Sequence, residues 1–196
     1  MVKVYAGMAA AAIGALLGGT AWYINAQRHA DIYADCRGGT VGGGELGGRS
    51  TIVTGEAASV TDKDVITKPS LVYFGYTFCP DVCPLDNARN AEAVDILEES
   101  GLEVTPVFIS IDPERDTPNL HPKMIGLTGT PEQVQAASKA YKTYYKKHDD
   151  GGEFYLMDHS TFTYLVDPKK GFLDFFKRED TPDQMAKRVA CYMSKG

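Results

Sequence analysis

The chain has 196 residues, a net charge of −6 and 43% hydrophobic residues. A chain of this size can bury a substantial core, so we expect one globular domain with some appendage. The mildly acidic balance, without long basic runs, argues against nucleic acid as the main partner.

The chain opens with an uncharged apolar run from Val4 to Ile24, which ends in aromatic residues. A helix of about 20 residues crosses the roughly 30 Å hydrocarbon core of a bilayer. We therefore expect residues 1–27 to form an N-terminal transmembrane helix, followed by a polar tether over residues 28–40. Lys3 favours a cytoplasmic N-terminus. This predicts a single span in a bacterial inner membrane with the soluble domain in the periplasm. A cleaved signal peptide is the alternative, although Ile24 fits a cleavage site poorly.

A glycine-rich stretch from Gly38 to Gly48 leads into the domain that we expect over residues 41–196. Two short strand candidates follow, at 50–54 and 58–60, and predict a β-hairpin at an edge of the main sheet. Residues 61–64 are typical of a turn or helix cap.

The next element carries two cysteines. The apolar run Leu71–Phe78 is typical of a buried strand, and Cys79 and Cys83 follow at its carboxyl end, where ligands collect in α/β folds. Pro84 disfavours helical dihedrals in the preceding residue and suits a helix start, so we expect Cys83 near the N-cap of a helix that continues over Asp86–Ser100. A helix N-terminus favours the thiolate, which binds metals or attacks disulfides. The stretch therefore predicts a reactive dithiol without deciding its use.

The remaining elements complete an α/β order. A second continuous apolar strand implies a parallel βαβ unit with a right-handed crossover. A helix, a hairpin and a terminal helix follow, and the order predicts a thioredoxin-like fold with an added N-terminal β-hairpin. The ranges are Val104–Ile111 for the strand, Pro131–Lys146 for the helix, Phe162–Val166 and Phe172–Phe176 for the hairpin, and Thr181–Met193 for the last helix.

One histidine stands in an informative place. His159 precedes the strand candidate Thr161–Val166, and in a thioredoxin-like topology this loop packs against the cysteine turn. Two sulfurs and one nitrogen form a soft set suited to copper, especially Cu(I), or to zinc. Asp158 or a backbone carbonyl could orient the ring. We expect Met157 to be a core residue rather than a thioether ligand.

The other two cysteines, Cys36 and Cys191, flank the predicted domain. We expect a structural disulfide that ties the tether to the last helix, which requires an oxidising compartment. The alternative is a second metal or redox site, but no histidine or acidic cluster accompanies these positions.

Four motifs together resemble the Sco/SenC family over roughly residues 60 to 193. They are Phe74–Pro84, Asp112–Pro118, Gly126–Gly129 and Asp158–Ser160. The resemblance implies a membrane-anchored copper protein with a thioredoxin-like fold that assists assembly of the dinuclear copper centre of cytochrome c oxidase. It places one copper ion per chain, Cu(I) or Cu(II), on Cys79, Cys83 and His159. It implies the copper-site subunit of the oxidase and a copper donor chaperone as partners. The segment Asn119–Ile125 departs from the family, since relatives carry a longer, partly helical segment there.

Three functions follow as hypotheses. The first is a metallochaperone for the oxidase copper site. The second is a thiol–disulfide oxidoreductase in which Cys79 and Cys83 would be the catalytic pair and would reduce the cysteines of the oxidase site. The third is a copper or redox sensor. His159 discriminates between the first two, because disulfide exchange needs no imidazole there.

Overall fold

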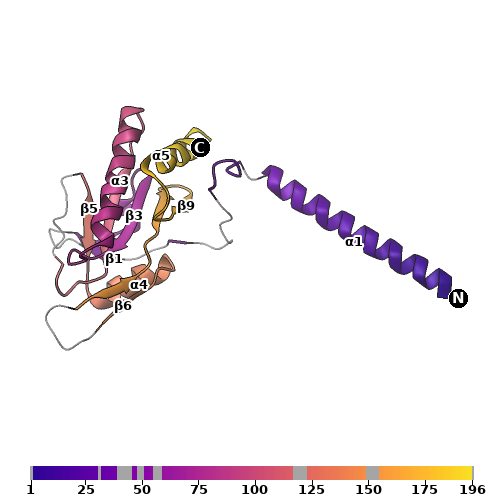
Figure 1. Ribbon diagram of the computed structural model, residues 1–196, viewed down its shortest axis with the longest axis horizontal. Coiled ribbons are helices and arrows are strands. Elements are labelled where there is room, and N and C mark those ends of the chain that lie inside the picture. Colours follow the sequence, from indigo (N-terminus) through magenta and orange to yellow (C-terminus); the bar gives the residue numbers. More distant parts are fainter. Residues whose placement is uncertain are drawn as a thin grey trace.

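The computed structural model describes residues 2–30, 32–38, 46–47, 51–54, 59–116, 123–148 and 155–195. A seven-stranded sheet has the order β2-β1-β5-β4-β3-β8-β9, and a separate two-stranded ribbon pairs β6 with β7 (Figure 1). The strands are β1 Thr51–Thr54, β2 Ser59–Thr61, β3 Ser70–Gly75, β4 Thr105–Ser110, β5 Ile125–Thr128, β6 Tyr145–Lys147, β7 Met157–His159, β8 Thr163–Asp167 and β9 Gly171–Phe176. The helices are α1 Val2–Ala30, α2 Asp62–Val65, α3 Val82–Glu99, α4 Pro131–Ala140 and α5 Pro182–Ser194.

The centre of the sheet is the predicted βαβ unit. Strands β3 and β4 pair in parallel, with α3 between them in sequence. Leu71 and Phe74 are each 1% exposed although they lie on opposite faces of β3, so the strand is buried on both sides, as its apolar run predicts. Helices α3 and α5 pack against each other over one face of the sheet, and α4 contributes to the core on the other face. The mixed sheet with helices on both faces confirms the predicted fold class.

Most predicted elements are present, with two differences. Helix α4 begins at the predicted cap, where the Thr130 hydroxyl accepts a hydrogen bond from the Gln133 backbone, but it ends at Ala140 instead of Lys146. Lys142 has a left-handed backbone conformation, with φ of 50°, which ends the helix and directs the chain into β6. Strands β5, β6 and β7 were not expected from the sequence.

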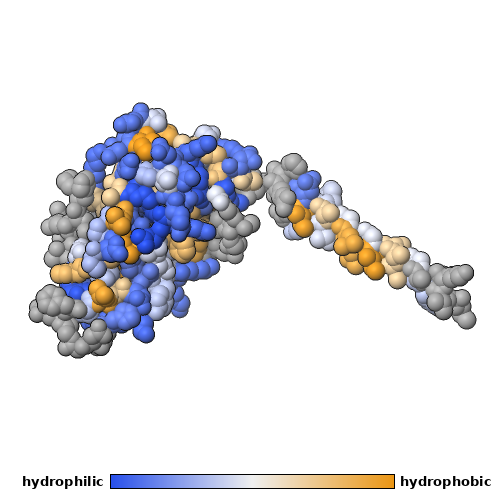
Figure 2. All heavy atoms as spheres, viewed as in Figure 1, coloured by the Kyte–Doolittle hydropathy of each residue, from blue (hydrophilic) through white to orange (hydrophobic). Residues whose placement is uncertain are grey.

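Helix α1 extends away from the domain, and the segment after it lies beside α5 (Figure 1). Within α1, the segment Gly7–Ala26 is long and apolar enough to cross a membrane, and Figure 2 shows hydrophobic residues along it. The helix runs past the expected anchor boundary at residue 27. Cys36 and Cys191 form a disulfide, and the rings of Tyr33 and Tyr192 lie 5.2 Å apart. The segment after α1 is thus fixed to α5.

The N-terminal hairpin is also present, since β1 and β2 pair antiparallel at the edge of the sheet. Most of the glycine-rich stretch Gly38–Gly48 and most of the short segment Asn119–Ile125 lie outside the described residues.

Candidate metal centre

The two cysteines lie in the turn between β3 and α3. The backbone amide of Cys79 donates to the Tyr76 carbonyl oxygen at 3.3 Å, and the amide of Cys83 donates to Cys79 Sγ at 3.3 Å. Helix α3 starts at Val82 after the N-cap residue Asp81, so Cys83 lies in the first turn, near the N-cap as expected, and Pro84 is the third helical residue. Pro84 fits this position because the first-turn amides have no partner within the helix.

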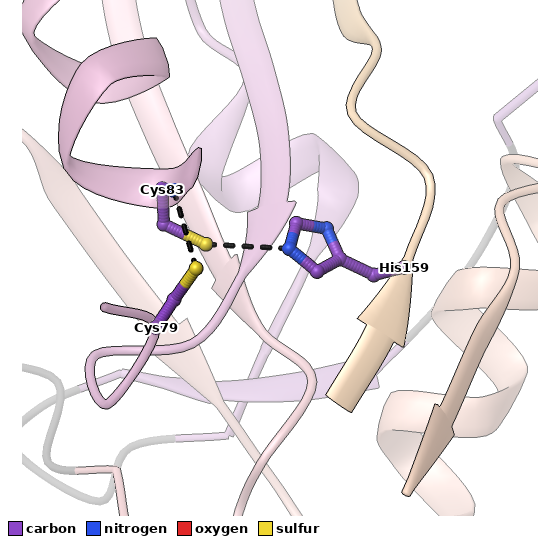
Figure 3. A group of neighbouring side chains, drawn as sticks. All are labelled: Cys79, Cys83 and His159. Atoms are coloured by element: carbon purple, nitrogen blue, oxygen red, sulfur yellow. Dashed lines mark hydrogen bonds between the residues drawn. The ribbon is translucent and has the colours of Figure 1, made fainter. Parts of the chain in front are cut away.

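The third residue of the group comes from the ribbon. His159 is the last residue of β7, and its Nε2 atom lies 3.4 Å from Cys83 Sγ (Figure 3). The two sulfur atoms and one histidine nitrogen all lie within 4.8 Å of one another. Three atoms bonded to one ion at about 2.0–2.3 Å in a trigonal arrangement are about 3.5–4.0 Å apart, so a single ion fits after the ligand atoms move together by up to about 1 Å. The structure therefore brings Cys79, Cys83 and His159 together as one possible ligand set.

Hydrogen bonds and ring contacts orient the imidazole. His159 Nδ1 lies 2.9 Å from the carbonyl oxygen of Ser160, and donation to that oxygen leaves the lone pair of Nε2 facing the sulfurs. The rings of Tyr73 and Tyr76 meet the imidazole edge-on, at 6.2 and 5.8 Å between centroids. Of the two orienting groups considered from the sequence, the backbone carbonyl takes this role. Asp158 instead pairs with His148 at 2.7 Å.

The surroundings of the two thiols shift their pKa values in opposite directions. Burial raises the pKa of the Cys79 thiol, but the backbone amides of Cys83, Asp81 and Val82 at the start of α3 outweigh it, and the net result is a lowered pKa. Burial raises the pKa of Cys83 to about 12, and Cys79 adds to that increase. Burial also lowers the pKa of His159, which favours the neutral imidazole that binds metals. The site thus combines a nucleophilic sulfur, a deeper protonated sulfur and a neutral nitrogen.

The loop after β4 supports the cysteine turn, because the carboxyl ends of the parallel strands β3 and β4 lie at the same end of the sheet. The Asp116 carboxylate accepts hydrogen bonds from the Thr77 backbone amide at 3.0 Å and from the Thr77 hydroxyl at 2.6 Å. The same carboxylate accepts from the Ser110 hydroxyl at 2.7 Å. The Arg115 guanidinium lies 4.8 Å from the centroid of Phe78 in that turn. These contacts fix the backbone that carries Cys79.

Buried charged residues of α3 pack next to the metal centre, and the sequence did not reveal them. Asp86 is 3% exposed and accepts a hydrogen bond from the Tyr73 hydroxyl at 3.0 Å, while Arg89 is 9% exposed and donates to a backbone carbonyl of the segment after β9. Ala88 of the same helix is exposed, although an apolar residue is more typical of a buried face. The available signal was spacing, because Asp86 follows Cys83 by three residues and shares its helix face.

The site is open to solvent on one side. A cleft of about 260 Å³ runs along Cys79 and His159, between the cysteine turn and β7. Leu156 lines it and is 54% exposed. Met157 is buried in the core, as expected. A small ligand or the side chain of another protein can therefore approach the sulfur of Cys79.

Comparison with known proteins identifies the relatives of the chain. Residues 39–194 match the family model described as SCO1/SenC. Protein SenC of Rhodobacter capsulatus is 52% identical over 194 residues, which cover 94% of this chain and 88% of that protein. The human mitochondrial SCO1 homolog is 38% identical over 159 residues, which cover 76% of this chain and 53% of that protein. The chain thus spans most of the bacterial relative and about half of the human one.

Solved structures match the same region. Arabidopsis thaliana ScoI with copper bound superposes with a TM-score of 0.72 at 38% identity, over 77% of this chain and 99% of that chain. Bradyrhizobium japonicum ScoI with copper bound gives a TM-score of 0.65 at 33% identity, over 76% of this chain and 98% of that chain. Yeast Sco1 with copper bound gives a TM-score of 0.69 at 32% identity, over 77% of this chain and 90% of that chain.

Proposed function

Because the chain belongs to the SCO1/SenC family, we propose that it binds copper and delivers it to the copper-site subunit of cytochrome c oxidase. Sco proteins are described as cytochrome c oxidase assembly proteins, and three solved relatives at 32–38% identity carry copper. The observation that carries the proposal is the convergence of Cys79, Cys83 and His159 within 4.8 Å. The chain receives the ion from a copper donor chaperone and holds one ion at a time.

The chemistry of this donor set suits transfer. Thiolate and imidazole ligands favour Cu(I), and the same set also accepts Cu(II). Three ligands leave the ion open on one side, so a thiolate of the target can bond to copper while a donor of this chain leaves. The cleft beside Cys79 gives the incoming ligand a path to the ion. Copper thus moves by ligand exchange, without a change in its charge.

Copper loading of the full chain in detergent tests this proposal. The variants Cys79→Ser, Cys83→Ser and His159→Ala should each lose at least about tenfold in affinity, whereas the wild type should bind one ion per chain. His148→Ala is a matched control, because His148 lies nearby but pairs with Asp158 outside the ligand set. Unchanged copper binding in His159→Ala would show that the imidazole is not a ligand and would refute the proposal.

We also propose that α1 anchors the chain in a bacterial inner membrane with the domain in the periplasm. The apolar segment Gly7–Ala26 supports a single span, and the disulfide between Cys36 and Cys191 favours an oxidising compartment. Protease added to intact spheroplasts should degrade the domain. Protection until the membrane is lysed would place the domain on the cytoplasmic side.

A second function, thiol–disulfide exchange, is favoured by the opposite pKa shifts of the two thiols. Cys79 would attack a disulfide of the target, and Cys83 would resolve the mixed disulfide. The target gains two electrons and two protons as a dithiol, while Cys79 and Cys83 become a disulfide. In His159→Ala, retained reductase activity with lost copper binding would show that this activity is independent of the metal.

A further inference from the structure

A cleft of about 570 Å³ with basic walls lies between the end of α4 and β6. Four exposed lysines line it, together with Tyr144, whose side chain is 56% exposed. Its charge is opposite in sign to the net charge of −6 of the whole chain. The four are Lys139, Lys142, Lys146 and Lys147.

Most of this positive charge is not compensated within the described residues. Lys147 pairs with Glu114 at 2.7 Å, whereas Lys139, Lys142 and Lys146 form no ion pair in the described part of the chain. Asp158 stands opposite Lys146 in the ribbon, but its carboxylate pairs with His148 at 2.7 Å. Three ammonium groups around an exposed tyrosine therefore present a surface suited to carboxylates, and aromatic residues are enriched in protein interfaces.

The basic cleft adjoins the metal centre through the ribbon. Strand β6 lines the basic cleft, and β7 lines the cleft along Cys79 and His159. Tyr145 of β6 pairs with His159 of β7. Ser160 and Tyr144 are joined by two hydrogen bonds, at 2.9 Å from the Ser160 amide to the Tyr144 carbonyl and at 3.0 Å from the Tyr144 amide to the Ser160 hydroxyl. A protein that covers the ribbon would therefore contact both clefts.

We propose that the lysine-lined cleft docks an acidic surface of the copper-site subunit of the oxidase, next to the ion that is transferred. The inference rests on the proposed function and adds the chemistry by which the partner is recognised. A membrane surface is the less favoured occupant, because the disulfide between Cys36 and Cys191 joins the anchor segment to α5. Figure 1 shows α4 and β6 at the opposite end of the domain from α5.

Copper transfer to the soluble copper-site domain of the same organism's oxidase tests the inference. Lys139→Gln combined with Lys146→Gln should slow the second-order transfer rate about three- to tenfold at low salt, because charges at the rim of an interface act mainly on association. The difference should shrink as salt screens the charges. Lys169→Gln combined with Lys187→Gln is the matched control, since it removes two exposed lysines outside the cleft. Copper affinity should stay unchanged in both double variants.

The outcomes separate the two proposals. Equal transfer rates in the wild type and both double variants would overturn the docking inference while copper delivery stands. If the wild type transfers no copper, delivery to the oxidase fails, and direct binding of the same domain, measured by calorimetry, then tests docking alone. A transfer rate that is lowered in the cleft variant only when the chain is reconstituted in vesicles that contain phosphatidylglycerol, and not in neutral detergent, would assign the cleft to lipid and overturn the inference.

Discussion

Replacing Gly75 by Ala would place a methyl group against the sulfur of Cys83. A Cβ atom at this position would lie 3.0 Å from Cys83 Sγ, 2.8 Å from Cε1 of Tyr73 and 3.0 Å from Cε2 of Phe108. Carbon atoms in contact prefer about 3.5–4.0 Å. All three neighbours are at most 2% exposed, so none can move into solvent. We therefore expect the Cys83 sulfur to shift by a few tenths of an ångström.

The expected losses of unfolding free energy and of copper affinity follow from the cost of overpacking and from the narrow range of ligand distances that a metal site accepts. Overpacking a core costs about 1–3 kcal/mol of unfolding free energy. Ligand distances are held to about 0.2 Å, and changes behind a ligand typically cost about 10–100-fold in metal affinity. Gly75→Ala should therefore lower copper affinity by about that factor. A competition titration against a chromophoric Cu(I) chelator measures the affinity, and urea unfolding of the metal-free protein measures the stability.

Val189→Ala separates a local effect from general destabilisation. Val189 of α5 is fully buried in the hydrophobic cluster that α3 and α5 form against the sheet, away from the metal centre. Loss of its two methyl groups should cost about 2 kcal/mol, with little change in copper affinity. Wild-type affinity in Gly75→Ala would refute the reasoning. An equal loss of affinity in both variants would also refute it, because the effect would then come from stability alone.

Three further predictions concern the thiols, the disulfide and the ribbon. Iodoacetamide should modify Cys79 at lower pH than Cys83, because the pKa of Cys79 is lowered while that of Cys83 is raised to about 12. Mass spectrometry over a pH series measures the modification of each cysteine, and equal reactivity of the two would contradict the prediction. Replacing Cys36 and Cys191, 155 residues apart, by Ala should lower the unfolding free energy by about 2–5 kcal/mol in urea titrations and leave copper affinity unchanged. Ser160→Ala removes a hydrogen bond worth about 0.5–1.5 kcal/mol, so stopped-flow chelation should show copper leaving about two- to tenfold faster. Ser194→Ala, at the end of α5, should leave that rate unchanged.

The sequence predicts the parts of the fold that are specified locally. The run from Leu71 to Phe74 is apolar at every position because both faces of β3 are covered, so its burial can be read without knowledge of its neighbours. Thr130 and Thr181 mark helix starts because a capping threonine followed by proline satisfies the free amides of the first turn. His159 could be joined to the dithiol only through the expected topology, since 76 residues separate it from Cys83.

The features that the sequence does not reveal depend on contacts between distant residues. Tyr145 continues an apparently helical pattern, and only the left-handed turn at Lys142 and the pairing with β7 make it part of a strand. Asp86 and Arg89 are charged and therefore suggest a solvated face. They are buried because Tyr73 and a backbone carbonyl satisfy them, which single-sequence periodicity cannot show.

The metal centre joins two separate elements of the fold, the cysteine turn and the ribbon. The dithiol follows an interior strand of the seven-stranded sheet, and Asp116 fixes the turn that carries it. His159 lies on a ribbon of two three-residue strands that, within the described residues, pair with each other and not with the seven-stranded sheet. The buried side chain of Met157 and a hydrogen bond from its amide to the Tyr76 hydroxyl at 3.3 Å hold the ribbon against the domain. Any movement of the ribbon would move the imidazole, while Asp116 holds the turn that carries Cys79. The lysine-lined cleft is formed in part by the same ribbon, so a partner that docks there contacts the element that carries His159.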